Sequence, residues 1–125
     1  MDSEAAFADE AERKRALSAY FGLCSWLDHN VGLILAALEA TGLAAETTVV
    51  YASDHGDNAG ARGLWGKSNM YEESVAVPLM IAGPGIAPGT CDLPVSLVDL
   101  AATIPAIFGL PPLPGPGQDL RALAA

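Results

Sequence analysis

The chain has 125 residues, of which 51% are hydrophobic, and a formal net charge of -9 at pH 7. A chain of this length can bury one hydrophobic core and is short for two ordinary domains, so we expect a single domain over residues 1–125. The acidic balance disfavours nucleic acid and anionic membranes as partners, because both are bound mainly through Lys and Arg.

The N-terminus carries no recognisable export signal. It begins Met1-Asp2-Ser3-Glu4, acidic where a secretory signal is basic, and no apolar segment with a small-residue cleavage site follows. The most apolar stretches, near Val31–Leu38 and Val75–Ile86, look too short or too broken by Pro and Gly to span a bilayer. We therefore expect a cytoplasmic protein without a membrane segment.

A long helix is the first predicted element, from about Phe7 to Ala40. Its first turn is acidic and Thr41-Gly42 closes it. Apolar residues recur at helical spacing and predict a face that packs on a sheet: Leu17, Tyr20, Cys24, Leu27, Val31, Ile34, Leu35 and Leu38.

A short strand over Thr47–Ala52 is predicted next, and the chain places Ser53-Asp54-His55-Gly56 at its end. The strand is β-branched and apolar, which is typical of a buried parallel strand, and ligands bind outside the carboxyl ends of such strands. Asp54 offers a carboxylate oxygen and His55 an imidazole nitrogen, the donor types that hold metal ions. Asp, His and Gly are also ordinary turn residues, so a plain loop is the alternative.

The rest of the chain predicts fewer regular elements. A Gly-rich loop over Ser53–Ser68 is longer than ordinary connections and indicates function. A second strand is predicted at Val77–Ala82, and a helix at Leu97–Phe108 with Ser96 as N-cap and Pro105 limiting its length. Residues 110–125 form a Pro/Gly-rich connector and a tail.

The order of several short motifs resembles the sulfatase family of the alkaline-phosphatase-like superfamily. Ser53-Asp54-His55-Gly56 is followed by Gly63-Leu64-Trp65-Gly66-Lys67 and then by Met70-Tyr71-Glu72-Glu73-Ser74, and the resemblance runs from about Tyr20 to Leu120. It implies the C-terminal part of the sulfatase catalytic domain. The fold would be α/β, a partial alkaline-phosphatase-like sandwich with the long N-terminal helix packed on a short, mostly parallel sheet.

The resemblance also implies roles for three residues. Asp54 and His55 would bind a divalent cation, with Ca²⁺ first and Mn²⁺ or Mg²⁺ as alternatives, and Lys67 would be the catalytic residue that contacts the anionic ester. The substrate would be a small-molecule sulfate ester. We expect Trp65 to anchor the loop by packing. We expect Asp57 either to lie behind the metal ligands or to be a solvated loop residue.

Two parts of a sulfatase site are not found in this sequence. The family uses an adjacent pair of Asp ligands and a nucleophile motif, Cys-x-Pro-x-Arg or Ser-x-Pro-x-Arg. Neither Cys24 nor Cys91 has the Pro and Arg of that motif, so we expect neither to be the nucleophile. Two cysteines do not make a disulfide framework, and we expect two packed thiols rather than a pair. We therefore expect the 125-residue chain alone to be inactive.

Three functional hypotheses follow. The chain is a fragment of a sulfatase-type, metal-dependent hydrolase of sulfate monoesters, a fragment of a phosphoester or phosphonate monoester hydrolase, or a non-catalytic remnant that serves as a binding or assembly module. The expected protein partners are a missing N-terminal half or further copies of the chain, because an incomplete sheet leaves strand edges and apolar surface exposed.

Overall fold

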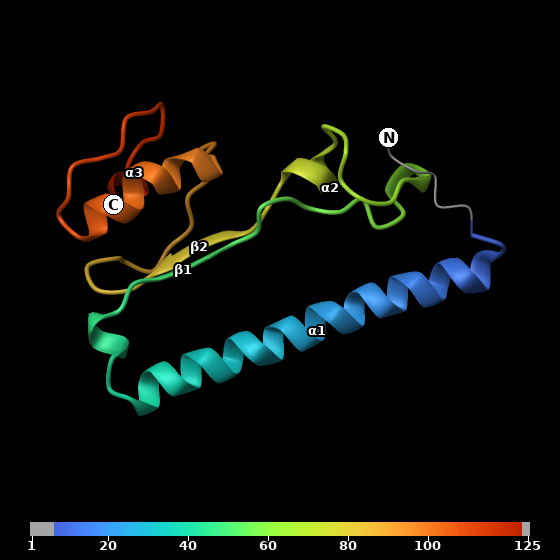
Figure 1. The fold of residues 1–125 in the computed structure, drawn as a ribbon, viewed down its shortest axis with the longest axis horizontal. Helices are drawn as coiled ribbons and strands as arrows, with labels where there is room; N and C mark the ends of the chain where they lie inside the picture. The colour runs from blue at the N-terminus through green and yellow to red at the C-terminus, as the bar shows by residue number, and fades with distance from the viewer. Residues whose placement is uncertain (1–6, 124–125) are drawn as a thin grey trace. The chain divides into compact units, whose positions relative to one another are not determined.

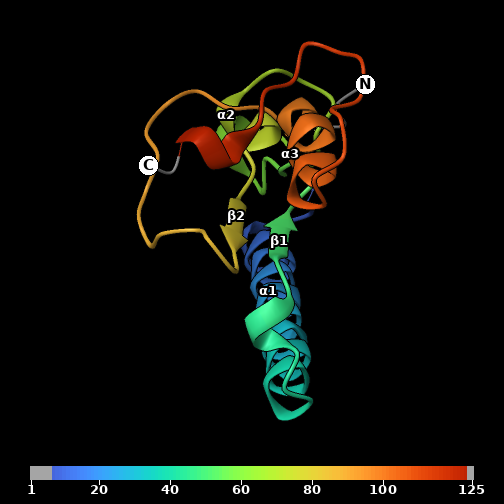
Figure 2. The ribbon, with the colours of Figure 1, turned by 90° about the vertical axis from the view of Figure 1, so that its left-hand side faces the viewer.

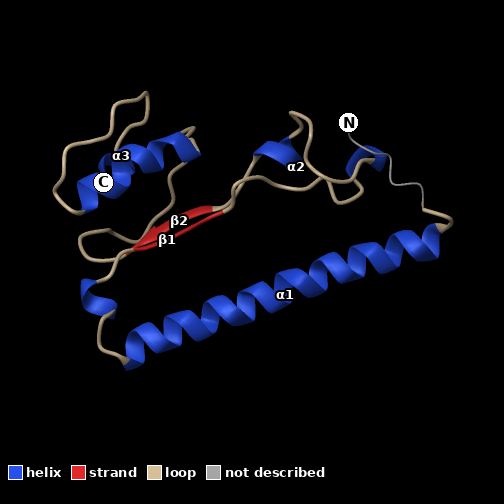
Figure 3. Ribbon diagram, viewed as in Figure 1, coloured by secondary structure: helices blue, strands red, loops and turns tan. Residues whose placement is uncertain are grey.

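The computed structural model of the protein describes residues 7–123 (Figure 1). Three helices and two strands follow one another along the chain, as the colours of Figure 3 show: α1 (Glu10–Ala40), β1 (Val49–Ala52), α2 (Glu72–Val75), β2 (Leu79–Ala82) and α3 (Leu100–Ile107). Short 3-10 turns lie at Ala44–Glu46, Ala61–Gly63, Leu97–Asp99 and Leu120–Leu123. The acidic start of the chain and the last two residues of the predicted tail lie outside the described residues.

The predicted long helix is confirmed, with a start three residues later than expected. Asp9 is its N-cap and accepts a hydrogen bond from the Glu12 N–H at 2.8 Å. The helix ends at Ala40, and Thr41 is its C-cap, whose N–H donates to the Ala37 carbonyl; Gly42 follows with φ of 75°. A positive φ is the conformation that glycine adopts most readily, which explains why the helix stops there.

None of the residues of α1 is buried, so the prediction that its apolar face packs on a sheet is wrong for this structure. Trp26 is 64% exposed and Ile34 68% exposed. The helical spacing of apolar residues identifies a face that water disfavours, but it does not say which segment covers that face.

α1 is also long and apolar enough to cross a membrane by length and composition alone, with a mean hydropathy of 1.3 over an 18-residue window. The helix continues well beyond the short apolar stretch at Val31–Leu38, and the expectation that this stretch does not span a bilayer stays a prediction. Core helices of soluble proteins have the same length and composition.

β1 and β2 pair into a two-stranded sheet (Figure 1). Both predicted strands are confirmed with shorter bounds, and the α/β class with them, but the two strands run antiparallel rather than parallel. A continuous apolar run indicates burial and leaves strand direction open. Parallel pairing also needs a substantial crossover, usually helical, whereas the connection from β1 to β2 contains only the four-residue α2 and one 3-10 turn.

The described chain divides into two compact units. The first consists of residues 7–44 with Tyr51–Leu79, and the second of Ala45–Val50 with residues 80–123. All three predicted site residues belong to the first unit.

The second unit is organised around α3 and the 3-10 turn at Leu120–Leu123, which lie side by side (Figure 2). The predicted N-cap is confirmed: Ser96 and Asp99 form a capping box at the start of this helical segment. Pro105 lies inside α3, which continues for two more residues to Ile107. The C-terminal connector is less loose than predicted, because Leu120 is buried and begins a helical turn.

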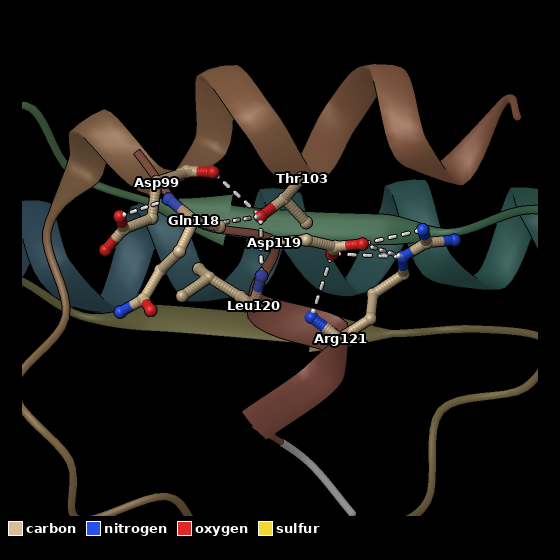
Figure 4. Close-up of polar contacts among 6 residues, drawn as sticks. All are labelled: Asp99, Thr103, Gln118, Asp119, Leu120 and Arg121. Atoms are coloured by element: carbon tan, nitrogen blue, oxygen red, sulfur yellow. Dashed lines mark hydrogen bonds and ion pairs between the residues drawn. The ribbon is translucent and has the colours of Figure 1, made fainter. Parts of the chain in front are cut away.

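Two buried polar side chains fasten this connector to α3 (Figure 4). The Thr103 hydroxyl donates to the Asp99 carbonyl at 2.8 Å and accepts the Leu120 N–H at 3.0 Å. The Asp99 carboxylate accepts the Gln118 N–H at 2.9 Å and the Ser96 N–H at 2.7 Å. These hydrogen bonds satisfy backbone groups that irregular Pro/Gly-rich sequence would otherwise leave unpaired.

Candidate functional site

The turn that follows β1 holds Asp54 and His55 in a defined geometry. The Ser53 hydroxyl donates to the His55 carbonyl at 2.7 Å. His55 Nδ1 lies 2.8 Å from the Gly56 carbonyl oxygen. A carbonyl oxygen can only accept, so Nδ1 carries the proton and, in the neutral ring, Nε2 carries the lone pair. Metal-binding histidines are commonly held in this way, with one nitrogen donating to a backbone carbonyl and the other free for the metal.

The three predicted site residues come together at His55 Nε2. Asp54 Oδ2 lies 3.4 Å from this nitrogen, and the Lys67 ammonium contacts it directly although the two residues are 12 positions apart. The Asp54 side chain is 84% exposed and that of His55 37% exposed. The structure thus places one carboxylate, one imidazole lone pair and one ammonium on an accessible surface.

The backbone around this group is tightly packed at Gly56. A Cβ atom added there would lie 2.1 Å from the Glu73 carbonyl oxygen, which no side chain can tolerate. The Gly56 N–H donates to the Ser74 carbonyl at 2.9 Å. Glycine is therefore required because α2 approaches the chain directly after His55.

The segment before Lys67 is held from inside the loop. The Gly66 carbonyl accepts two hydrogen bonds from Asn58, one from its backbone N–H at 2.9 Å and one from Nδ2 at 2.6 Å. Asn58 is 2% exposed, and its Oδ1 is buried without a hydrogen-bond partner among the described residues. Asp57 accepts from the Ala59 N–H at 2.7 Å and the Gly66 N–H at 3.3 Å. Its carboxylate thus links the backbone of Ala59 to that of Gly66 within the loop.

Trp65 packs as expected. Its indole packs against Gly60: a Cβ atom added to that glycine would lie 3.4 Å from the ring. The Phe7 ring meets Trp65 edge to face, with centroids 5.0 Å apart. On α1, partial removal of the Tyr20 phenol from water raises its pKa, and the charges of Cys24 and Asp57 act in the same direction.

Arg62 has contacts that the sequence did not reveal. Its guanidinium forms an ion pair with Glu73 at 2.5 Å and lies 4.4 Å from the centroid of the Tyr71 ring. The pKa of the Glu73 carboxyl is lowered, first by a hydrogen bond from its own backbone N–H and then by the Arg62 guanidinium. Arg62 has φ of 55°, an unfavourable value for a residue with a side chain, so these contacts offset local strain. The Tyr71-Glu72-Glu73-Ser74 motif was the only sequence signal for this cluster.

The two cysteines are unpaired, as expected, but both are exposed rather than packed. Within residues 7–123 no group of three His, Cys, Asp or Glu residues is placed to hold a metal ion. Asp54 and His55 are thus two neighbouring donors without a third such side chain grouped with them in this part of the chain.

Comparison with known proteins gives a consistent family. The family model described as Sulfatase matches residues 2–110. The choline-sulfatase of Rhizobium meliloti (strain 1021) is 45% identical over 101 residues, which cover 81% of this chain and 20% of that protein. Arylsulfatase K of Danio rerio is 40% identical over 103 residues, covering 82% of this chain and 20% of the relative. Human arylsulfatase K is 40% identical over 101 residues, covering 80% and 19%.

A solved structure has the same fold. It is that of BT4656 in complex with its substrate D-glucosamine-2-N,6-O-disulfate, with a TM-score of 0.65 and 31% sequence identity. The match covers 78% of this chain and 20% of that one. The α/β fold is thus part of an alkaline-phosphatase-like architecture, and the chain spans about a fifth of the length of the relatives it matches. The matched residues and the shared fold show that this chain belongs to the sulfatase family.

Proposed function

We propose that the chain contributes one side of the active site of a metal-dependent hydrolase of sulfate monoesters. The observation that supports this most strongly is the convergence of Asp54, His55 and Lys67 on one exposed point. The sulfated ligand of BT4656 and the name choline-sulfatase favour a small-molecule sulfate ester as the substrate class.

Lys67 has the chemistry to bind such a substrate. A sulfate ester is anionic, and its cleavage develops further negative charge on the leaving oxygen. An ammonium held in place before the reaction stabilises that charge without reorganising. The Lys67 ammonium contacts His55 Nε2, and from this position it would donate to an oxygen of an ester bound beside Asp54 and His55.

Asp54 and His55 fit the role of metal ligands. The accessible carboxylate of Asp54 suits a hard cation, and the protonated Nδ1 of His55 leaves Nε2 as a donor beside it. Ca²⁺ is the first candidate, with Mn²⁺ and Mg²⁺ as alternatives. A divalent cation bound there would neutralise charge on the ester oxygens.

Two ligands do not complete such a site. Ca²⁺ takes about six to eight oxygen ligands in proteins. We therefore propose that the remaining ligands and the nucleophile come from sequence outside these 125 residues, and that the chain alone is inactive. The chain would then work as part of a complete sulfatase domain.

The test places this chain in such a domain. The chain replaces the matching segment in the choline-sulfatase of Rhizobium meliloti, to which it is 45% identical over 101 residues. The chimera is assayed on choline sulfate and on phosphocholine, which share the choline group and differ in the ester. Each rate is measured with Ca²⁺, Mn²⁺ or Mg²⁺ added, for the chimera and for its Asp54→Ala variant. Asp28→Ala on α1, which removes a carboxylate away from the candidate site, is the matched control.

Preferential cleavage of choline sulfate that depends on the metal and on Asp54 is the expected result. A preference for phosphocholine would support the phosphoester hydrolase instead. A chimera that unfolds cooperatively and cleaves neither compound would contradict the proposal and support a non-catalytic binding or assembly module.

A further inference from the structure

The one-turn helix α2 connects the two segments that carry the candidate site. Ser74 in this helix is 2% exposed. Its hydroxyl donates to the Lys67 carbonyl at 2.5 Å, and its own carbonyl accepts the Gly56 N–H at 2.9 Å. One buried residue thus bonds both to the backbone directly after His55 and to the backbone of Lys67.

This link matters because neither segment has regular structure. Ser53–Ser68 contains no α-helix or strand, and Gly66, next to Lys67, has φ of 83°. Lysine also has a flexible four-carbon stem, so the position of its ammonium depends on how firmly its backbone is held. Asn58 fixes the Gly66 carbonyl and Ser74 fixes the next one, that of Lys67.

The rest of α2 strengthens the connection. Glu73 binds Arg62 at 2.5 Å on the loop side, and the Glu73 carbonyl packs against Gly56. The Ser74 N–H donates to the Tyr71 carbonyl at 2.8 Å, which closes the turn. The two other polar groups of Ser74 bond to the two site segments: its hydroxyl to Lys67 and its carbonyl to Gly56.

We propose that Ser74 is a positioning residue that sets the distance between Lys67 and His55 and so places the Lys67 ammonium for the reaction. This inference rests on the proposed role of Lys67 in sulfate ester cleavage. Displacement of a reacting group by about 1 Å costs on the order of 100-fold in rate, so a single hydroxyl that fixes a backbone can control activity.

The experiment is a double-mutant cycle in the choline-sulfatase chimera. Ser74→Ala removes the hydroxyl and should lower kcat about 10- to 100-fold. Lys67→Ala should lower it about 100- to 1,000-fold. If Ser74 acts through Lys67, adding Ser74→Ala to Lys67→Ala causes no further loss, whereas a residue that only supports folding would lower kcat again. Ser74→Thr keeps the hydroxyl and should restore part of the rate. Ser68→Ala, an exposed serine beside Lys67, is the control and should leave kcat unchanged.

The outcomes separate the two proposals. If Lys67→Ala leaves kcat unchanged, the proposed role of Lys67 is wrong. If Lys67→Ala is impaired while Ser74→Ala behaves like Ser68→Ala, or if the losses multiply in the double mutant, the positioning role of Ser74 is wrong.

A second measurement does not depend on the chimera. In the 125-residue chain, NMR order parameters at the amides of Lys67 and Ser68 should fall in Ser74→Ala and stay at the parent value in Ser68→Ala at all amides except its own. Unchanged order at Lys67 in Ser74→Ala would overturn the proposal.

Discussion

Replacing Gly56 by alanine should disrupt the loop that carries the candidate site. The added Cβ would lie 2.1 Å from the Glu73 carbonyl oxygen, 3.0 Å from its carbon and 3.2 Å from the Ala76 oxygen. Relief to an ordinary contact requires a backbone movement of about 1 Å or more. All these neighbours are backbone atoms, so no side chain can rotate away.

The expected loss of stability follows from two contributions. Overpacking in a close-packed region costs about 1–3 kcal/mol. The same movement breaks the hydrogen bond from the Gly56 N–H to the Ser74 carbonyl, which contributes about 1 kcal/mol. Together Gly56→Ala should destabilise the first unit by about 2–4 kcal/mol.

Urea unfolding followed by the fluorescence of Trp65 measures this effect where it arises. Trp26 is 64% exposed, so Trp26→Phe removes the second fluorophore at little cost. Gly32→Ala is the control, because nothing lies within 4 Å of its added Cβ and alanine favours a helix over glycine by about 1 kcal/mol. A Gly56→Ala protein with the midpoint of its parent would refute the close approach of α2 to His55.

Three further predictions concern the second unit and the metal. Thr103→Val should cost about 1–3 kcal/mol in urea unfolding, because it leaves the buried Leu120 N–H without its acceptor, and Thr103→Ser should retain most of the stability. The pKa of Asp99 is lowered by hydrogen bonds from the N–H groups of Gln118 and Ser96, so the stability it contributes is complete above its unfolded pKa of about 3.9 and is lost as the pH falls through the lower folded value. The urea concentration at the unfolding midpoint should therefore decrease when the pH is lowered below about 4, and it should decrease less in Asp99→Asn than in the parent protein. An equal decrease in the parent and in Asp99→Asn would contradict this assignment. Calorimetric titration of the 125-residue chain with Ca²⁺ should show binding weaker than micromolar, since two ligands of about six to eight are present; tighter binding abolished by Asp54→Ala would show that the chain alone completes a site.

Local sequence signals predicted the elements of the second unit well. Ser96 followed by Asp99 reads as a helix start because a short polar side chain there can bond free N–H groups, and the structure has that cap. The apolar run at Val49–Ala52 likewise becomes a strand. These signals depend on neighbours a few residues away, so the sequence contains them directly.

Features that depend on distant segments were not predictable in the same way. The apolar face of α1 was identified, but not that none of its residues would be buried by the described part of the chain, because amphipathic spacing says nothing about a partner. The direction of the β1–β2 pair was mistaken, because the apolar run was taken as a sign of a parallel strand buried on both faces, whereas both strands are only partly buried. The Arg62–Glu73 pair joins residues 11 positions apart and needed the loop geometry to be seen.

The candidate site lies between these cases. The motifs around Asp54, His55 and Lys67 suggested their roles, and the structure brings the three together. The role of Ser74 was missed because its two hydrogen bonds are to backbone atoms of Gly56 and Lys67. Every residue type has these backbone atoms, so the sequence does not indicate such partners.

The most direct test of the central claim is the rate of choline sulfate cleavage by the chimera with Lys67→Ala, compared with Lys14→Ala, an exposed lysine on α1. Loss of a preorganised charge at the reacting ester predicts a fall in kcat of about 100- to 1,000-fold for Lys67→Ala and none for Lys14→Ala. Equal rates for the two variants in folded protein would contradict the claim that this chain supplies a working part of a sulfatase active site.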